Sequence, residues 1–159
     1  MSGLVLSDPV LPGAVARHLE LQIRSAQRLL DLVLRQGAAI RERDVETVLG
    51  CLAEIQVEMA AREALEGERE ALVARAAARL GIDREEVSLA ALDSLATPAE
   101  RDELLLRSAA LRGLLAEIAR EHGINRALMR QELTFLDHLI RISGEQPEPG
   151  PNRLMDVEA

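Results

Sequence analysis

The chain has 159 residues, of which 48% are hydrophobic and only 1% aromatic, and its net charge at pH 7 is −8. This acidic balance argues against non-specific nucleic-acid binding, which needs a cationic surface facing phosphate. The single cysteine excludes a disulfide framework and a cluster of thiolate metal ligands.

The first thirteen residues contain Pro9 and Pro12 but no basic side chain. They match neither a signal peptide nor a membrane span, so we expect residues 1–13 to be flexible. Apolar runs elsewhere are only a few residues long, which predicts a cytoplasmic protein without stable membrane insertion. Ala, Leu, Glu and Arg dominate the rest and are good helix formers. We therefore expect an all-α fold, an elongated antiparallel three-helix bundle or coiled coil over residues 14–142.

The first helix is expected over about residues 14–41. Its apolar residues step by three and four positions, as a heptad seam does: Val15, Leu19, Ile23, Ala26, Leu30, Val33, Gly37 and Ile40. The second helix is expected over residues 45–80, with Asp44 as its N-cap and Gly81 just past its end.

Polar residues interrupt the seams of the second and third helices. Those in the second are Arg62, Glu66 and Arg69, and those in the third include Glu121 and Asn125. Such residues often fix helix register. We expect Arg62 or Arg69 to meet Glu121 or a nearby carboxylate when these helices pair antiparallel. The alternative is that the long side chains only extend to the edge of the seam.

A third helix is expected over about residues 98–142, after a connector with two one-turn helices whose leucines cover the end of the bundle. Thr97 and Glu100 form a capping box, and Pro98 suits the first helical position. Gly123 leaves two alternatives, a continuous helix or a break with Asn125 capping a new one; the unbroken apolar phase favours continuity.

The end of the third helix is too apolar for one seam. Leu128, Phe135, Leu139 and Ile142 form one stripe, and Met129, Leu133, Leu136 and Ile140 form a second about 120° away. One stripe is then free for a partner; the alternative is a single wide core face. Helix lengths predict that about residues 134–142 overhang the second helix. Residues 143–159, rich in Pro, Gly and acids, are expected to be disordered.

Catalytic motifs are missing from the sequence, which lacks phosphate-binding glycine loops, the H-E-x-x-H metal motif and the G-x-S-x-G nucleophile motif. We expect no enzyme activity, no cofactor and no metal. His18 and His138 are expected to be surface residues, and Cys51 a small buried hydrophobe.

The order of these parts resembles the FlgN family of flagellar type III export chaperones over roughly residues 14–142. The resemblance rests on the Arg-Glu-Arg-Asp-Val turn at residues 41–45 and on Leu65, Glu66, Arg69, Leu72 and Val73 in the second helix. In the last helix it rests on Asn125, Leu128, Leu133, Asp137 and Leu139.

The resemblance implies a cytosolic chaperone. Such a protein holds the hook–filament junction proteins FlgK and FlgL by their C-terminal helices, prevents premature polymerisation and delivers them to the export gate and ATPase. The family's substrate-binding region falls on residues 128–142, which gives these candidates: Leu128, Met129, Leu133, Phe135, Leu136, Leu139 and Ile140. Two alternatives stay open: a homo-oligomeric coiled-coil scaffold without an export role, and a chaperone for a different axial protein.

Overall fold

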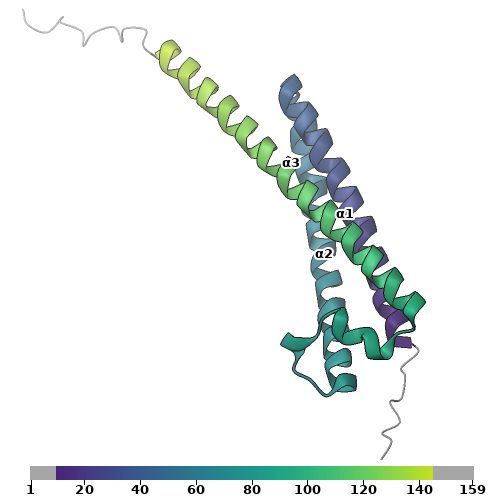
Figure 1. Ribbon diagram of the computed structural model, residues 1–159. Helices are drawn as coiled ribbons and strands as arrows, with labels where there is room; N and C mark the ends of the chain where they lie inside the picture. The colour runs from purple at the N-terminus through teal and green to yellow at the C-terminus, as the bar shows by residue number, and fades with distance from the viewer. Residues whose placement is uncertain (1–9, 145–159) are drawn as a thin grey trace, which may run out of the picture.

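The computed structural model describes residues 10–144 and confirms the predicted all-α fold (Figure 1). Its long helices are α1 (Val10–Glu42), α2 (Val45–Leu80) and α3 (Pro98–Gly144). Two short 3₁₀ helices, η1 (Arg84–Glu86) and η2 (Ala90–Leu95), form the connector between α2 and α3. The predictions for residues 1–9 and 145–159 lie outside the described residues.

Local capping signals set the helix ends where the sequence predicts them. The Thr47 amide donates to Asp44 Oδ1 at 3.1 Å, and the Thr47 hydroxyl donates to Asp44 Oδ2 at 2.6 Å. These two hydrogen bonds hold the pKa of the Asp44 carboxyl below its usual value. Gly81 ends α2 with a left-handed φ of 64°, which glycine adopts without steric cost.

The start of α3 has the predicted capping box. The Glu100 amide donates to the Thr97 hydroxyl and the Thr97 amide donates to the Glu100 carboxylate, both at 3.2 Å. The helix then runs without a break through Gly123 to Gly144. The favoured alternative of a continuous helix is therefore confirmed.

The first helix begins earlier than expected. It starts at Val10, not at Ala14, and Leu11 is fully buried. Pro12 does not prevent this, because a proline in the first helical turn sacrifices no hydrogen bond. The expectation of a flexible segment is thus wrong for residues 10–13, and the expectation of disorder is wrong for residues 143–144, which belong to α3.

Both other long helices pack on α1, and they hardly touch each other. Contacts to α2 run in the opposite sense along α1, whereas contacts to α3 run in the same sense. The pairs that show this are Arg28–Glu58 and Arg35–Glu54 for α2, and Arg107–Glu20, Asn125–Val33 and Glu132–Arg43 for α3. The up–down–up topology is as expected, but α1 stands between two neighbours that do not close against each other.

The connector closes one end of the molecule. Leu92 and Leu95 of η2 are buried against Leu11 of α1 and Ala76 of α2, and partly buried apolar side chains surround them. The expectation that the connector leucines cover the end of the bundle is confirmed. This cluster ties α1, α2 and the connector together at one end, while the other end stays open.

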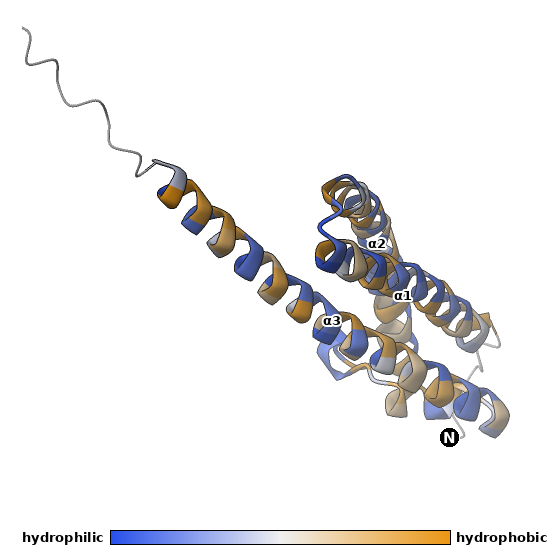
Figure 2. Ribbon diagram, turned by 90° about the horizontal axis from the view of Figure 1, so that it is seen from above, coloured by the Kyte–Doolittle hydropathy of each residue, from blue (hydrophilic) through white to orange (hydrophobic). Residues whose placement is uncertain are grey.

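At the open end, α3 extends far beyond the hairpin formed by α1 and α2 (Figures 1 and 2). Every residue from 133 to 144 is exposed. We call residues 133–144 the protruding end of α3. In the part of the chain that the structure describes, no helix is long and apolar enough to cross a membrane.

Candidate functional site

A close backbone approach fixes the position at which α3 crosses α1. Asn125 is only 3% exposed, and its side-chain amide donates to the Val33 carbonyl at 2.7 Å. A Cβ atom at Gly37 would lie 2.5 Å from Asn125 Oδ1, closer than van der Waals contact allows. Glycine at position 37 therefore makes room for Asn125 at the point where α3 crosses α1.

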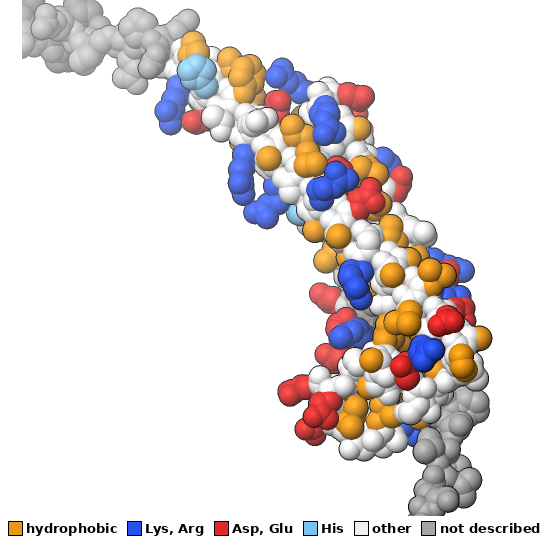
Figure 3. Space-filling model, viewed as in Figure 1, with side chains coloured by type: hydrophobic (Ala, Val, Ile, Leu, Met, Phe, Trp, Pro, Cys, Tyr) orange, Lys and Arg blue, Asp and Glu red, His pale blue; other side chains and the backbone are white. Residues whose placement is uncertain are grey.

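The protruding end and the turn before it carry the predicted partner-binding residues. Leu128 is half-buried against α1, and the others are between 37% and 69% exposed: Met129, Leu133, Phe135, Leu136, Leu139 and Ile140. Hydrophobic and basic side chains lie side by side near this end in the space-filling view (Figure 3). The Arg43 guanidinium lies 5.2 Å from the centre of the Phe135 ring, within cation–π range.

The two apolar stripes of the protruding end face different directions. Ser108 and Leu115 line a hollow shared with α2. Met129 and Leu136 lie two and three heptads beyond Leu115, so they continue the same row of the helix. The stripe with Phe135 faces the turn between α1 and α2, where Arg43 lies, and the stripe with Met129 and Leu136 lies about 120° around the helix from it.

The hollow between α2 and α3 is a groove of about 410 Å³ with α1 as its floor. Its walls are mostly apolar and come from all three long helices and the connector. They include Leu19, Leu72, Val73, Val87, Leu89, Leu111 and Leu115. The sequence did not predict this groove, because heptad patterns suggested that α2 and α3 pack directly against each other.

The expected ion pair between α2 and α3 is not formed. Arg62 instead donates to the Ser25 hydroxyl of α1 at 3.3 Å. Arg69 pairs with Glu66 at 2.8 Å, and Glu121 pairs with Arg120 at 3.2 Å, each within its own helix. The physical reason is that α2 and α3 both pack on α1 with a groove between them, so the two helices make few direct contacts. The role of Arg62, Glu66, Arg69, Glu121 and Asn125 in setting helix register stays a prediction.

Glu58 is the hub of a polar network that joins α1 to α2. It accepts hydrogen bonds from the Ser25 hydroxyl at 2.7 Å and from two guanidinium nitrogens of Arg28 at 3.1 and 3.0 Å. The Arg28 hydrogen bonds are the main cause that lowers the pKa of Glu58. The same contact raises the pKa of Arg28.

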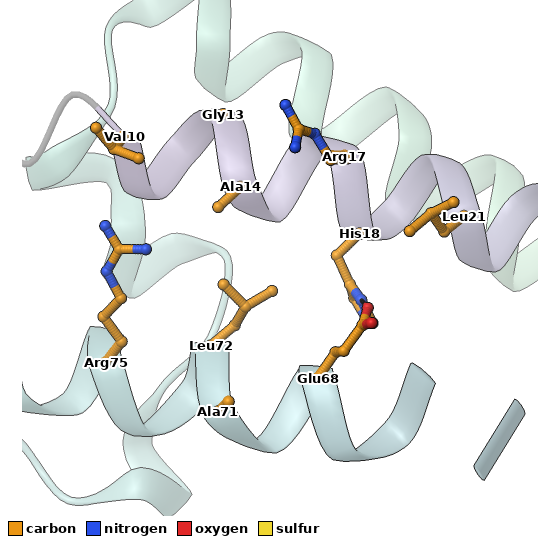
Figure 4. A pocket seen from close by; sticks show the side chains of 10 residues that line it. All are labelled: Val10, Gly13, Ala14, Arg17, His18, Leu21, Glu68, Ala71, Leu72 and Arg75. Atoms are coloured by element: carbon orange, nitrogen blue, oxygen red, sulfur yellow. Dashed lines mark ion pairs between the residues drawn. The ribbon is translucent and has the colours of Figure 1, made fainter. Parts of the chain in front are cut away.

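A second hollow, of about 580 Å³, lies between α1 and α2 (Figure 4). Small residues Gly13, Ala14 and Ala71 shape it. His18 borders it and points towards Glu68, with Nδ1 3.7 Å from the carboxylate, too far for a hydrogen bond. His18 is only 7% exposed. The expectation that it is a surface residue is therefore wrong, because α2 packs closely over this face of α1.

Two further expectations concern single residues. His138 is exposed, as predicted, and Cys51 is buried at 1% exposure, as predicted. Within residues 10–144, no three His, Cys, Asp or Glu side chains converge on a point where they could hold a metal ion. The distinctive surfaces of the described chain are thus the exposed apolar side chains at the end of α3 and a mostly apolar groove between α2 and α3, which are suited to binding other helices.

A comparison with protein families agrees with the resemblance expected from the sequence. The family model described as "FlgN protein" matches residues 13–153, nearly the whole chain. Searches among curated proteins and solved structures find no match to this chain.

Proposed function

Because this chain belongs to the FlgN family of flagellar export chaperones, we propose that its substrates are the hook–filament junction proteins FlgK and FlgL. In this proposal the chaperone binds their C-terminal helical segments in the cytoplasm. It prevents their premature polymerisation and delivers them to the export gate and the export ATPase.

The observation that carries this proposal is the protruding end of α3. Residues 133–144 are all exposed, with Phe135 lying against Arg43 of the turn between α1 and α2, and they carry six large apolar side chains: Leu133, Phe135, Leu136, Leu139, Ile140 and Ile142. Exposed apolar surface of this kind marks a site of protein association, because leaving it in water is unfavourable.

Helix-on-helix pairing is the mechanism that this surface supports. An amphipathic substrate helix laid along α3 buries its own apolar face and that of the chaperone together. Large apolar side chains near the centre of such an interface usually dominate its free energy. We therefore assign the role of anchors to Phe135, Leu136, Leu139 and Ile140, with Leu128, Met129 and Leu133 extending the contact.

The test is titration calorimetry with the C-terminal segment of FlgK from the same organism. Leu136→Arg places a charge in the proposed interface, and we expect at least a tenfold loss of affinity. Thr134→Arg, two residues away, introduces the same charge outside both stripes and should bind like the unmodified chain. Equal binding by the two variants would contradict the assignment of the site.

Light scattering on the same samples separates the chaperone from the alternative of a homo-oligomeric scaffold. A chaperone that uses its protruding end for substrate forms a one-to-one complex and has a mass near 17.4 kDa without substrate. A stable oligomer of the folded chain that does not bind the FlgK segment would favour the scaffold instead.

A further inference from the structure

The groove between α2 and α3 has no part in the α3 contact described above. The groove continues beyond the connector end, because another hollow along α2, distinct from the one beside His18, shares three of its lining residues, Gln22, Arg62 and Glu66. This further hollow reaches Ile55 and Met59. The two hollows thus form one channel that runs from η2 towards the open end of the molecule.

An exposed apolar row on α2 extends this channel. Val45, Leu52 and Met59 are separated by seven residues each, so they lie on one face of the helix. They are 66%, 43% and 50% exposed, although all three are large and apolar. Because Met59 lines the channel, Leu52 and Val45 continue the same row of α2 from the channel towards the open end of the molecule.

The charged atoms within the groove between α2 and α3 are unevenly balanced. Its lining includes two arginines, Arg62 and Arg69, but only one carboxylate, Glu66. Arg62 is half-buried, and among the described residues its one hydrogen bond goes to the Ser25 hydroxyl, while its charge also interacts with the Glu58 carboxylate beside that hydroxyl. A guanidinium has five N–H donors, so Arg62 can take a further acceptor. A carboxylate is the acceptor that a partly buried guanidinium binds most strongly.

We propose that this channel binds an amphipathic helix of the exported partner, with an acidic side chain placed opposite Arg62 and Arg69. Three helices around an elongated apolar slot leave the position of the fourth helix in a four-helix bundle, which is why a helix fits it. Along α2 the two hollows run from Ile55 to Ala76, about 32 Å at 1.5 Å per residue. The inference rests on the proposed function, and it adds α2 as the second wall of the substrate site.

The first test fills the groove. Ser108 is half-buried and lines the groove, whereas its neighbour Ala109 is exposed and does not line it. We expect Ser108→Trp to weaken binding of the FlgK C-terminal segment at least tenfold, and the matched variant Ala109→Trp to leave it unchanged. Wild-type affinity of a folded Ser108→Trp variant would overturn the inference.

The comparison with Leu136→Arg keeps the two proposals apart. If Leu136→Arg loses binding and Ser108→Trp does not, the proposed function stands and the groove is excluded from the site. If neither variant loses binding, both proposals fail. Arg69→Gln, which removes a charge without adding bulk, should weaken binding less than Ser108→Trp but measurably, because it removes half of the proposed carboxylate contact.

A photo-crosslinker covers the case in which Ser108→Trp does not fold. Benzoylphenylalanine at position 108 of the full chain should crosslink to the FlgK segment, and the same group at position 109 should not. Crosslinking from position 108 to a second copy, or to the terminal segments of the same chain, would overturn the inference and assign the groove to that occupant.

Discussion

At the scale of single residues, Gly37 and Asn125 share a tight contact where α3 crosses α1. A heptad reading of α1 places position 37 on the seam but gives no reason for a glycine there. The reason is the buried amide of Asn125, which occupies the space that a Cβ would need. The two residues form one unit, so their substitutions should not have additive effects.

A double-mutant cycle tests this unit. Gly37→Ala alone should lower the free energy of unfolding by about 1–3 kcal/mol, because the added methyl overpacks the contact. In an Asn125→Ala background the same substitution should be neutral, or stabilising by up to about 1 kcal/mol, since alanine is the better helix former. Urea unfolding gives the free energy of unfolding of the unmodified chain, the two single variants and the double variant. Gly50→Ala, at a helical glycine with open space around it, is the control and should stabilise. If the losses of stability in the two single variants add up in the double variant, the two residues do not act through a shared contact.

The Glu58 network leads to a second prediction, which concerns how the stability of the protein changes at acidic pH. Because folding lowers the pKa of Glu58, the folded state favours its ionised form, and this stabilisation is present at neutral pH. It is lost as the pH falls through the lowered pKa of Glu58, where the carboxyl takes up a proton. Glu58→Gln should therefore lower stability by about 1–2 kcal/mol at pH 7 and have a smaller effect at pH 3.

Thermal or urea unfolding at both pH values measures the effect. Glu70→Gln, at an exposed position of the same helix, removes the same charge and should change little at either pH. A loss for Glu58→Gln that is as large at pH 3 as at pH 7 would show that the carboxylate charge is not what stabilises this contact.

At the scale of helices, the sequence predicts where each helix begins and ends better than it predicts which helices pack against each other. Asp44, Gly81 and the Thr97–Glu100 box act through their own neighbouring backbone, so the sequence alone is enough to place them. Which helix a stripe packs on depends on the whole arrangement. That is why Arg62 was expected opposite Glu121 but lies against Ser25.

The candidate site likewise combines features that follow from the local sequence with features that depend on how the helices pack together. The surplus apolar stripe and its approximate overhang follow from periodicity and helix length, and the structure places exposed side chains there. The groove depends on α2 and α3 packing on α1 without touching each other, which no local pattern records. The burial of His18 escaped prediction for the same reason, since only the approach of α2 covers it.

Hydrogen exchange tests the helix-scale description of α3. Amides in residues 134–144 should exchange faster than those in residues 104–125, because only the latter segment packs on α1. Addition of the FlgK segment should slow exchange in residues 134–144, while the buried core of α1 around Ala26 and Val33 should not change. Equal protection of the two segments without substrate would mean that the end of α3 is covered in solution. Fast exchange at Ile124 to Leu128 would indicate a soft joint after Gly123.

At the scale of the whole molecule, the helices form an extended shape and not a compact one. A globular chain of this length has a radius of gyration of about 15 Å. The 47 residues of α3 alone span about 70 Å. Packing is concentrated on α1 and at the connector end, so much of α2 and α3 remains in contact with solvent.

Small-angle X-ray scattering checks this shape. We expect a radius of gyration well above the compact value and a largest dimension of at least about 70 Å. A chain truncated after Glu132 should keep the fold and lose much of this dimension. A compact scattering profile for the full chain would mean that α3 bends back on the hairpin in solution.

The protruding end of α3 also affects how quickly a partner is met. Most protein pairs associate slowly relative to diffusion because two particular patches must be correctly oriented when they collide. Residues 136–144 extend about 14 Å beyond the contact between Arg43 and Phe135, and this part of the helix is open to partners arriving from nearly every direction. The chaperone then needs less precise orientation when the two proteins collide, so a larger fraction of collisions leads to binding. A newly made substrate that polymerises with copies of itself would therefore be bound sooner by a protruding helix than by a patch on a flat surface.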